Sequence, residues 1–151
     1  MLQLFAVQFK SCKEIKESQT DAESGIYTIY SKDDEPYTTY CEMETSDGGW
    51  TLVASIHEND INGKCTDGDK WSSENGVVER HGNTLWENDE IYGSAEAATT
   101  DDYKNKAYFE LEAEQLMIIQ VPNGKSSEEF VSSASFQYTT DAFLQQYGGK
   151  Y

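Results

Sequence analysis

The stretch that decides the fold runs from residue 37 to residue 56 and reads YTTYCEMETSDGGWTLVASI. Its two ends, Tyr37–Met43 and Trp50–Ile56, are rich in β-branched and aromatic residues, which favour strands. Between them, Thr45–Gly49 contains an aspartate and paired glycines, which readily take the positive φ of a tight turn. The stretch therefore predicts two antiparallel strands joined by a short turn.

Upstream of this stretch, the sequence predicts a helix and a third strand. Ser11 and Glu14 have the spacing of a capping box, so we expect a short helix over about residues 12–18. A strand is expected from Gly25 to Ser31, with alternate side chains on opposite faces of a sheet. Residues 31–36 predict a turn that contains Pro36. Helix and strands together predict an α+β fold built on a short antiparallel sheet.

Downstream, residues 57–102 are acidic and predict long loops, which in a compact domain are commonly functional. Residues 108–121 fit either a helix or two strands, and we favour a strand, a brief turn and a second strand. A further strand is expected over 130–139 and a capped helix over 140–148. The sequence marks no internal repeat and no clear domain boundary.

The composition excludes several classes of protein. The 151 residues carry 11 Lys and Arg against 28 Asp and Glu, a net charge of −17. Such a charge disfavours nucleic acid and anionic membranes as partners, because binding phosphate requires a basic face. No stretch approaches the roughly 18–20 apolar residues of a membrane-spanning helix. Aromatic residues make up 13% of the chain, which argues against disorder. The acidic residues either hold cations or form a solvated surface.

Cysteine usage leaves the compartment open. The three cysteines, Cys12, Cys41 and Cys65, form no C-x-x-C pair. They fit one disulfide and a leftover thiol in a secreted protein, or three free thiols in a cytosolic one. The N-terminal residues 1–10 are partly apolar but have neither a basic region nor an evident cleavage site, so they predict no clear signal peptide.

The segment from Glu58 to Asp69 has the oxygen spacing of a calcium-binding loop. Oxygen ligands stand at positions 1, 3, 5 and 12 of a twelve-residue window, and Gly63 stands at position 6, as in an EF-hand loop. The first ligand is Glu rather than Asp, the last is the short Asp69, and a predicted strand precedes the loop. We therefore expect a calcium loop of another kind, with a polar surface loop of chance spacing as the alternative.

Catalysis is not expected. His57 next to Glu58, or Cys65 with His57, would offer an acid–base pair or a thiol nucleophile. Neither pair has a third, orienting group at a recognisable spacing. The sequence predicts a protein that is not an enzyme.

Several blocks carry a family resemblance. Tyr40–Met43 followed by Gly48–Leu52 resembles the start of a fibrinogen-like domain. Further blocks, in the same order over about residues 11–147, resemble an intelectin, a member of the X-type lectins. They are SCKEI at 11–15, GWTLVASIHEND at 49–60, GKCT at 63–66, WSS at 71–73, GSAEAAT at 93–99 and DDYKN at 101–105.

The resemblance implies a fold and a function. The fold is α+β, a fibrinogen-like domain fragment with a short antiparallel sheet, short helices and long calcium-binding loops. Residues 11–151 would be a partial domain lacking its C-terminal half, preceded by an N-terminal segment, 1–10. Intelectins are secreted, calcium-dependent lectins of innate immunity that bind microbial glycans through exocyclic vicinal diols. The implied partners are therefore glycans and a homo-oligomer, with neither nucleic acid nor membrane insertion, and the implied cofactor is Ca²⁺.

The resemblance also implies site residues. One calcium site would use His57, through its backbone carbonyl, with Asp69 and Asp102. A second site would use the side chains of two acidic residues and the carbonyls of two glycines. These residues are Glu58, Asp60, Gly63 and Gly68. Cys12 and Cys41 match a family disulfide, and the family partner of Cys65 lies beyond this chain.

The sequence departs from the family in length. Family members are roughly twice as long, and the residues that hold the sugar lie in the half that is missing here. Residues 76–90 also diverge and look shortened. Two alternatives to a lectin follow. The chain is a fibrinogen-related domain that binds another polypeptide, or it is a truncated product without independent sugar binding.

Overall fold

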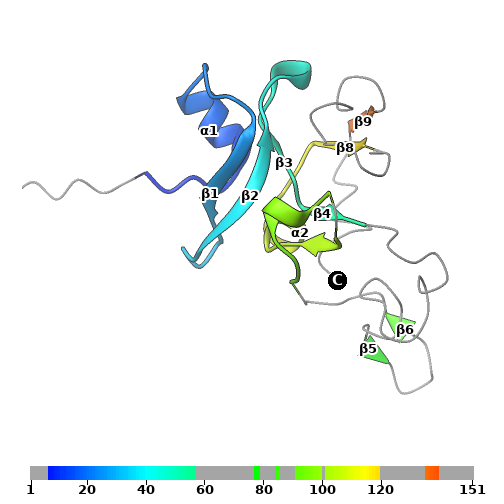
Figure 1. Cartoon of the computed structure of the whole chain (residues 1–151). Coiled ribbons are helices and arrows are strands. Elements are labelled where there is room, and N and C mark those ends of the chain that lie inside the picture. Colours follow the sequence, from blue (N-terminus) through cyan, green and yellow to red (C-terminus); the bar gives the residue numbers. More distant parts are fainter. Residues whose placement is uncertain are drawn as a thin grey trace, which may run out of the picture. The chain divides into compact units, whose positions relative to one another are not determined.

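The computed structural model describes residues 7–56, 91–99 and 101–119, together with the backbone of three short strands (Figure 1). Those strands are β5 (Val77–Val78), β6 (Thr84–Leu85) and β9 (Ser135–Thr139). The chain divides into two compact units, residues 1–52 and 53–151. The described elements are short antiparallel sheets and few short helices, which confirms the expected α+β class. No described helix has the length and apolar character needed to span a membrane.

The first unit contains one helix packed on a three-stranded sheet. Its elements are α1 (Cys12–Ser18), β1 (Gly25–Tyr30), β2 (Pro36–Glu42), the 3₁₀ helix η1 (Thr45–Asp47) and β3 (Trp50–Thr51). The strands are antiparallel in the order β1-β2-β3. The helix, the first two strands and the turns of this unit thus follow the sequence prediction, with small shifts at their ends.

Helix α1 begins where the capping pattern predicts. The Ser11 hydroxyl accepts a hydrogen bond from the Glu14 backbone N–H at 3.3 Å. The second half of the predicted capping box is different, because the Glu14 carboxylate accepts from the Lys10 backbone N–H at 2.7 Å. The glutamate therefore ties the residue before the cap, rather than the cap itself, to the helix.

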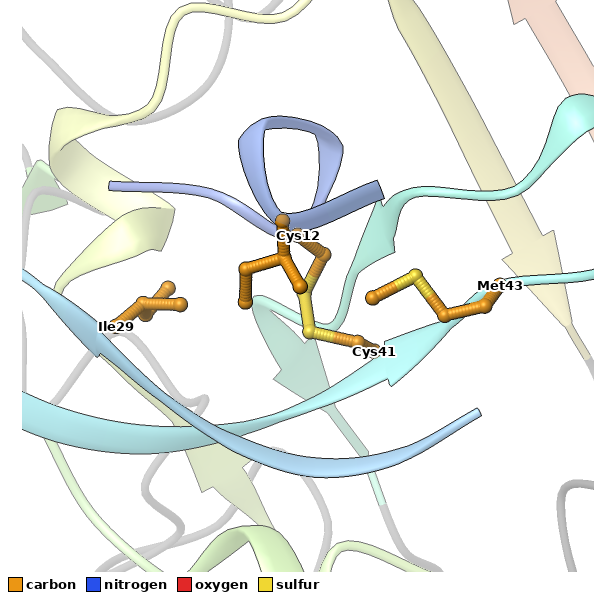
Figure 2. Close-up of a cluster of buried hydrophobic side chains, with 5 residues drawn as sticks. Cys12, Ile29, Cys41 and Met43 are labelled. Atoms are coloured by element: carbon orange, nitrogen blue, oxygen red, sulfur yellow. A yellow bond between two sulfur atoms is a disulfide. The ribbon is translucent and has the colours of Figure 1, made fainter. Parts of the chain in front are cut away.

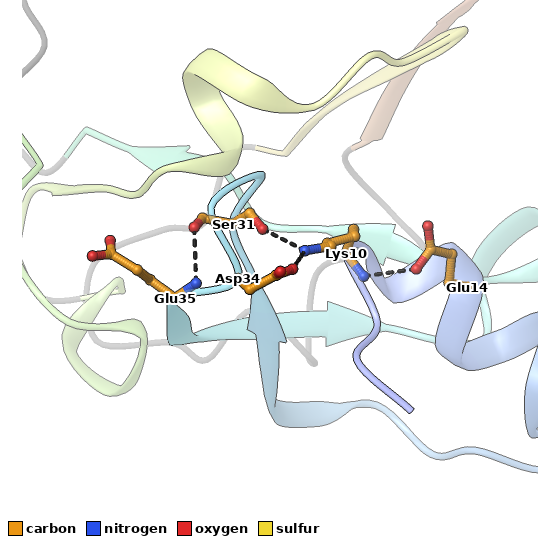
Figure 3. A network of polar contacts seen from close by, with 5 residues as sticks. All are labelled: Lys10, Glu14, Ser31, Asp34 and Glu35. Carbon is orange, nitrogen blue, oxygen red and sulfur yellow. Dashed lines mark hydrogen bonds and ion pairs between the residues drawn. The ribbon is translucent and has the colours of Figure 1, made fainter. Parts of the chain in front are cut away.

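Figure 3 shows how Lys10 fastens the chain entry to the turn between β1 and β2. Its ammonium donates to the Ser31 carbonyl at 2.6 Å and forms an ion pair with Asp34. The Ser31 hydroxyl accepts from the Glu35 backbone N–H at 3.1 Å. The turn is shorter than predicted, because Pro36 already pairs with Tyr30 as the first residue of β2.

The core of the first unit surrounds a disulfide between Cys12 of α1 and Cys41 of β2. Figure 2 shows this bond between the side chains of Ile29 and Met43, all four residues being buried. Ile15 completes the cluster from the next turn of the helix. The disulfide implied by the family resemblance is confirmed. On the chain-entropy account, closing a loop of this length stabilises the fold by about 3–4 kcal/mol.

The η1 turn is held by a buried carboxylate. The Glu42 side chain is buried and accepts from the backbone N–H groups of Glu44 at 2.9 Å and Thr45 at 3.0 Å. The Trp50 indole N–H then donates to the Thr45 carbonyl at 2.8 Å. The bonds to the Glu42 carboxylate are charge-assisted, and such bonds are stronger than those between neutral groups. They fix the turn that delivers the chain into β3.

The predicted strand Trp50–Ile56 is wrong as a single element. It forms two short strands, β3 and β4 (Ala54–Ser55), which belong to different sheets. The Leu52 N–H still donates to a carbonyl of β2, but the Leu52 carbonyl accepts a hydrogen bond from the Thr39 hydroxyl at 2.5 Å. A side chain thus replaces the partner strand at this point, and the ladder ends. An apolar, β-branched run gives no signal for such a change of partner.

The second unit contains two-stranded antiparallel pairs and short helices. β4 pairs with β7 (Tyr103–Lys104), β5 with β6, and β8 (Gln115–Ile119) with β9. A 3₁₀ helix, η3 (Ala95–Ala97), precedes β7 and a short helix, α2 (Ala107–Glu110), follows it.

The prediction for residues 108–121 is half right. Its second strand is confirmed as β8, and the strand expected over 130–139 is confirmed in part by β9. The first strand is wrong, because the chain turns into α2 instead. The Tyr108 N–H donates to the Asn105 carbonyl and the Phe109 N–H to the Lys106 carbonyl, at 3.2 and 3.0 Å. The helix expected over 140–148 lies outside the described residues.

Candidate functional site

Most residues predicted to bind calcium lie outside the described part of the chain. They are His57, Glu58, Asp60, Gly63, Gly68 and Asp69. Asp102 is the one that the structure describes, immediately before β7. What the structure reports on is therefore the position of Asp102 relative to the end of β4.

The pairing of β4 with β7 brings Asp102 to the end of β4. Ser55 is the antiparallel partner of Tyr103, so the next residues outward, Ile56 and Asp102, face each other in the same register. The Ser55 hydroxyl also donates to the Asp101 carbonyl at 3.2 Å, across 46 positions of sequence. Ile56 is covalently followed by the acidic segment that begins at His57. The strand that leads into the acidic segment is thus paired with the strand that follows Asp102.

Asp102 is held in place by its surroundings. It is 7% exposed, and its backbone N–H donates to the Asp101 carboxylate at 2.8 Å. On the side of β7 opposite β4, Tyr92 forms an isolated bridge with Lys104. That bridge needs Gly93, whose φ is +73° and where a Cβ would lie 2.3 Å from the Asp102 carbonyl oxygen. β7 is therefore fixed from both sides.

Lys104 is a buried cation among aromatic rings. It is 4% exposed. Its ammonium lies 5.3 Å from the ring centroid of Tyr92, 5.5 Å from that of Tyr108 and 5.0 Å from that of Phe109. Rings at this range attract a cation through their quadrupoles. Sequence reasoning missed this cluster, because Tyr92 approaches from a separate segment and the other two rings come from the helix predicted as a strand.

The comparison with known families covers the first unit and the start of the second. The profile described as "Fibrinogen beta and gamma chains, C-terminal globular domain" matches residues 8–86, just over half of the 151-residue chain. The chain belongs to this family. The fibrinogen-like fold predicted from the blocks at residues 40–52 is thereby confirmed.

Individual relatives match over a shorter stretch of this fibrinogen-related chain. Angiopoietin-4 of Mus musculus is 42% identical over 55 residues, which are 36% of this chain and 11% of that protein. The fibrinogen beta chain of Bos taurus is 35% identical over 66 residues, 43% of this chain and 13% of the relative. The match thus spans about an eighth of these relatives. The narrower resemblance to intelectins stays a prediction.

The structure gives a partial test of whether calcium fits. Among residues 7–56, 91–99 and 101–119, no three His, Cys, Asp or Glu side chains gather as a metal site. Asp102 nevertheless offers a carboxylate, the hard oxygen ligand that Ca²⁺ prefers, next to the strand that leads into the acidic segment. The donor type of Asp102 is one that the ion accepts. The other predicted ligands of both sites stay predictions.

Proposed function

We propose that this fibrinogen-related chain is part of a secreted, calcium-dependent lectin of the intelectin type that recognises microbial glycans. The observation that supports the proposal is the β4–β7 pairing, which joins the strand before the acidic segment to the strand that directly follows Asp102. The Cys12–Cys41 disulfide supports the extracellular location, because disulfides persist in oxidising compartments. The proposed activity is binding without catalysis, as fits a domain of the fibrinogen family.

The role proposed for calcium in this part of the protein is to cross-link loops. A bound ion supplies a centre on which carboxylate and carbonyl oxygens converge, and so neutralises some of the −17 charge. Asp102 would contribute from β7, with His57 and Asp69 from the acidic segment. Glu58, Asp60, Gly63 and Gly68 would form the second site. Sugar contact belongs to residues that the family carries C-terminal to this region.

A calcium titration tests the proposal. We expect millimolar Ca²⁺ to raise the thermal midpoint, because an ion at 100 times its Kd adds about 2.7 kcal/mol to stability. Asp102→Asn should remove at least half of the shift, since it replaces a charged ligand by a neutral one. The matched control is Glu96→Gln, an exposed acidic residue of the same unit, which should keep the full shift. A midpoint that calcium leaves unchanged in the parent chain contradicts the proposal.

The second candidate function is binding of another polypeptide. The relatives favour it, because one is named an angiopoietin and the other a fibrinogen chain, and neither is named a lectin. A glycan array with calcium, and again with chelator, separates the candidates. For the 151-residue chain we expect little signal, and for a chain extended through the family's C-terminal half a signal that chelator abolishes. An extended chain that binds calcium but no glycan supports the second candidate.

A further inference from the structure

The outer edge of β1 presents backbone groups that point away from the sheet. Among the strands that the structure describes, only β2 pairs with β1, so only one side of β1 faces another described strand. The Tyr30 N–H shows which residues face outward, because it donates to the Phe9 carbonyl at 2.8 Å and not to its partner in β2. Backbone direction alternates along an antiparallel strand. The N–H and C=O groups of Ile26 and Thr28 therefore also point outward.

This edge lacks the usual protection of an edge strand. Proteins generally guard such edges with charged residues, proline or a bulge. β1 reads GIYTIY and has no charge and no proline, and its pairing with β2 is continuous from Gly25 to Tyr30. Ile26 is 42% exposed and Thr28 is exposed as well. Residues 7–9, which meet the edge at Tyr30, form no strand beside it.

Charge at both ends of this edge favours a basic partner. Exposed acidic residues precede the strand at Asp21 and Glu23, and Asp33 follows it next to the exposed Lys32. The strand itself is neutral, so a partner would pair its backbone with β1 while its charged side chains reach these ends. A second copy of this chain would bring the same negative charge, which opposes self-pairing. Lysine and arginine complement the site.

We propose that the β1 edge binds an extended, Lys- or Arg-containing segment of a partner polypeptide by strand addition. In this mode, main-chain hydrogen bonds supply the affinity and flanking side chains the specificity. The six residues of β1 span about 20 Å, which suits a segment of similar length. The inference is independent of the calcium proposal, and it gives the polypeptide-binding candidate a defined surface.

The test uses the full chain and a seven-residue peptide that alternates lysine and valine, with blocked ends. On binding, amide exchange at Ile26 and Thr28 should slow, while amides of β2 that already face β1 should not change. Thr28→Pro deletes an outward N–H and spares the bonds to β2, so it should weaken binding by about ten-fold. Thr28→Val keeps the backbone and should stay within about two-fold of the parent.

A second peptide keeps the test valid if the proline variant is poorly folded. N-methylation of every residue of the peptide removes the N–H donors of both its edges without altering the protein, and it should abolish binding. A peptide that alternates glutamate and valine should bind at least about ten-fold more weakly, and Asp21→Asn with Glu23→Gln should reduce this preference. The β1 edge includes none of the predicted calcium ligands. The same results are therefore expected in the presence of chelator.

Three outcomes overturn the inference. Undiminished binding of the N-methylated peptide means that charge alone attracts the probe. Unchanged exchange at Ile26 and Thr28 in the complex places the peptide elsewhere. A dimer of the chain without peptide, detected by sedimentation and dissolved by Thr28→Pro, makes a second copy the occupant of the edge.

Discussion

Each of the two compact units has its own internal contacts, and these differ in how far apart in sequence the joined residues are. In the first, β1 and β2 are neighbours in sequence, and a disulfide joins residues 29 positions apart. In the second, a hydrogen bond beside the β4–β7 pair joins Ser55 and Asp101, 46 positions apart, with the predicted calcium segment between them. The described part of the second unit contains no comparable covalent link.

The difference matters because the loop that must close is longer and lacks a cross-link in the second unit. Loop closure is an entropic cost that grows slowly with length, and a disulfide removes part of it from the unfolded chain. The first unit therefore has its own means of staying folded. In the second unit, an ion that binds the segment between β4 and β7 would serve the same purpose.

The largest effect is expected from removing the disulfide. Replacing Cys12 and Cys41 by Ser should destabilise the first unit by about 3–4 kcal/mol, through greater freedom of its unfolded state and two lost core groups. Hydrogen exchange read by mass spectrometry measures this unit by unit. We expect faster exchange in peptides from residues 7–52 than in the parent.

Cys65→Ser is the control for this prediction, because it removes a thiol that the sequence predicts to be unpaired. It should leave exchange over residues 7–52 unchanged. Equal acceleration in peptides from residues 101–119 of the disulfide variant would show that the units unfold together. That result would contradict separate stabilisation of the two units.

A smaller effect is expected from the turn before β3. Gly48 has a φ of +72°, and a Cβ there would lie 2.0 Å from the Met43 carbonyl oxygen. Gly48→Ala should therefore destabilise the first unit by about 2–3 kcal/mol, which thermal or urea unfolding would measure. Gly25→Ala is the matched control, since a Cβ at Gly25 meets nothing within 4 Å. Equal losses in the two variants would contradict the steric argument.

The first unit was predictable because its signals are local. Ser11 marks the start of α1, alternation marks β1, and the glycines after Asp47 mark the turn into β3. The error at residues 50–56 has a long-range cause. Where the backbone leaves β2, the Thr39 hydroxyl donates to the Leu52 carbonyl in place of a strand partner, and the sequence near Leu52 gives no signal of this bond.

The candidate site was predictable only in its chemistry. Oxygen spacing between Glu58 and Asp69 indicates a cation, and the resemblance adds Asp102. That Asp102 faces the end of β4 depends on a strand of two residues, too short for periodicity to reveal. The ring cluster around Lys104 was missed because Tyr92 comes from a separate segment and the other two rings lie in a helix that was predicted as a strand. Both features depend on pairing between segments that are distant in sequence.

The smallest effect, and the sharpest probe of the second unit, is expected at Lys104. Lys104→Met keeps a long apolar side chain among the three rings but removes the charge that they attract. Cation–π contacts contribute about 0.5–2 kcal/mol, and the relief of burying a charge offsets part of this, so we expect a loss of about 1 kcal/mol or less. Exchange should accelerate over residues 101–111 and not over residues 7–52.

Lys13→Met, at an exposed lysine of α1, is the control and should change neither region. A gain in stability for Lys104→Met would mean that desolvation of the ammonium outweighs its attraction to the rings, because the side-chain volume is nearly kept. Acceleration over residues 7–52 would mean that the two units share one unfolding transition. With calcium present, a smaller effect of Lys104→Met on exchange would indicate that the ion and the ring cluster hold β7 together.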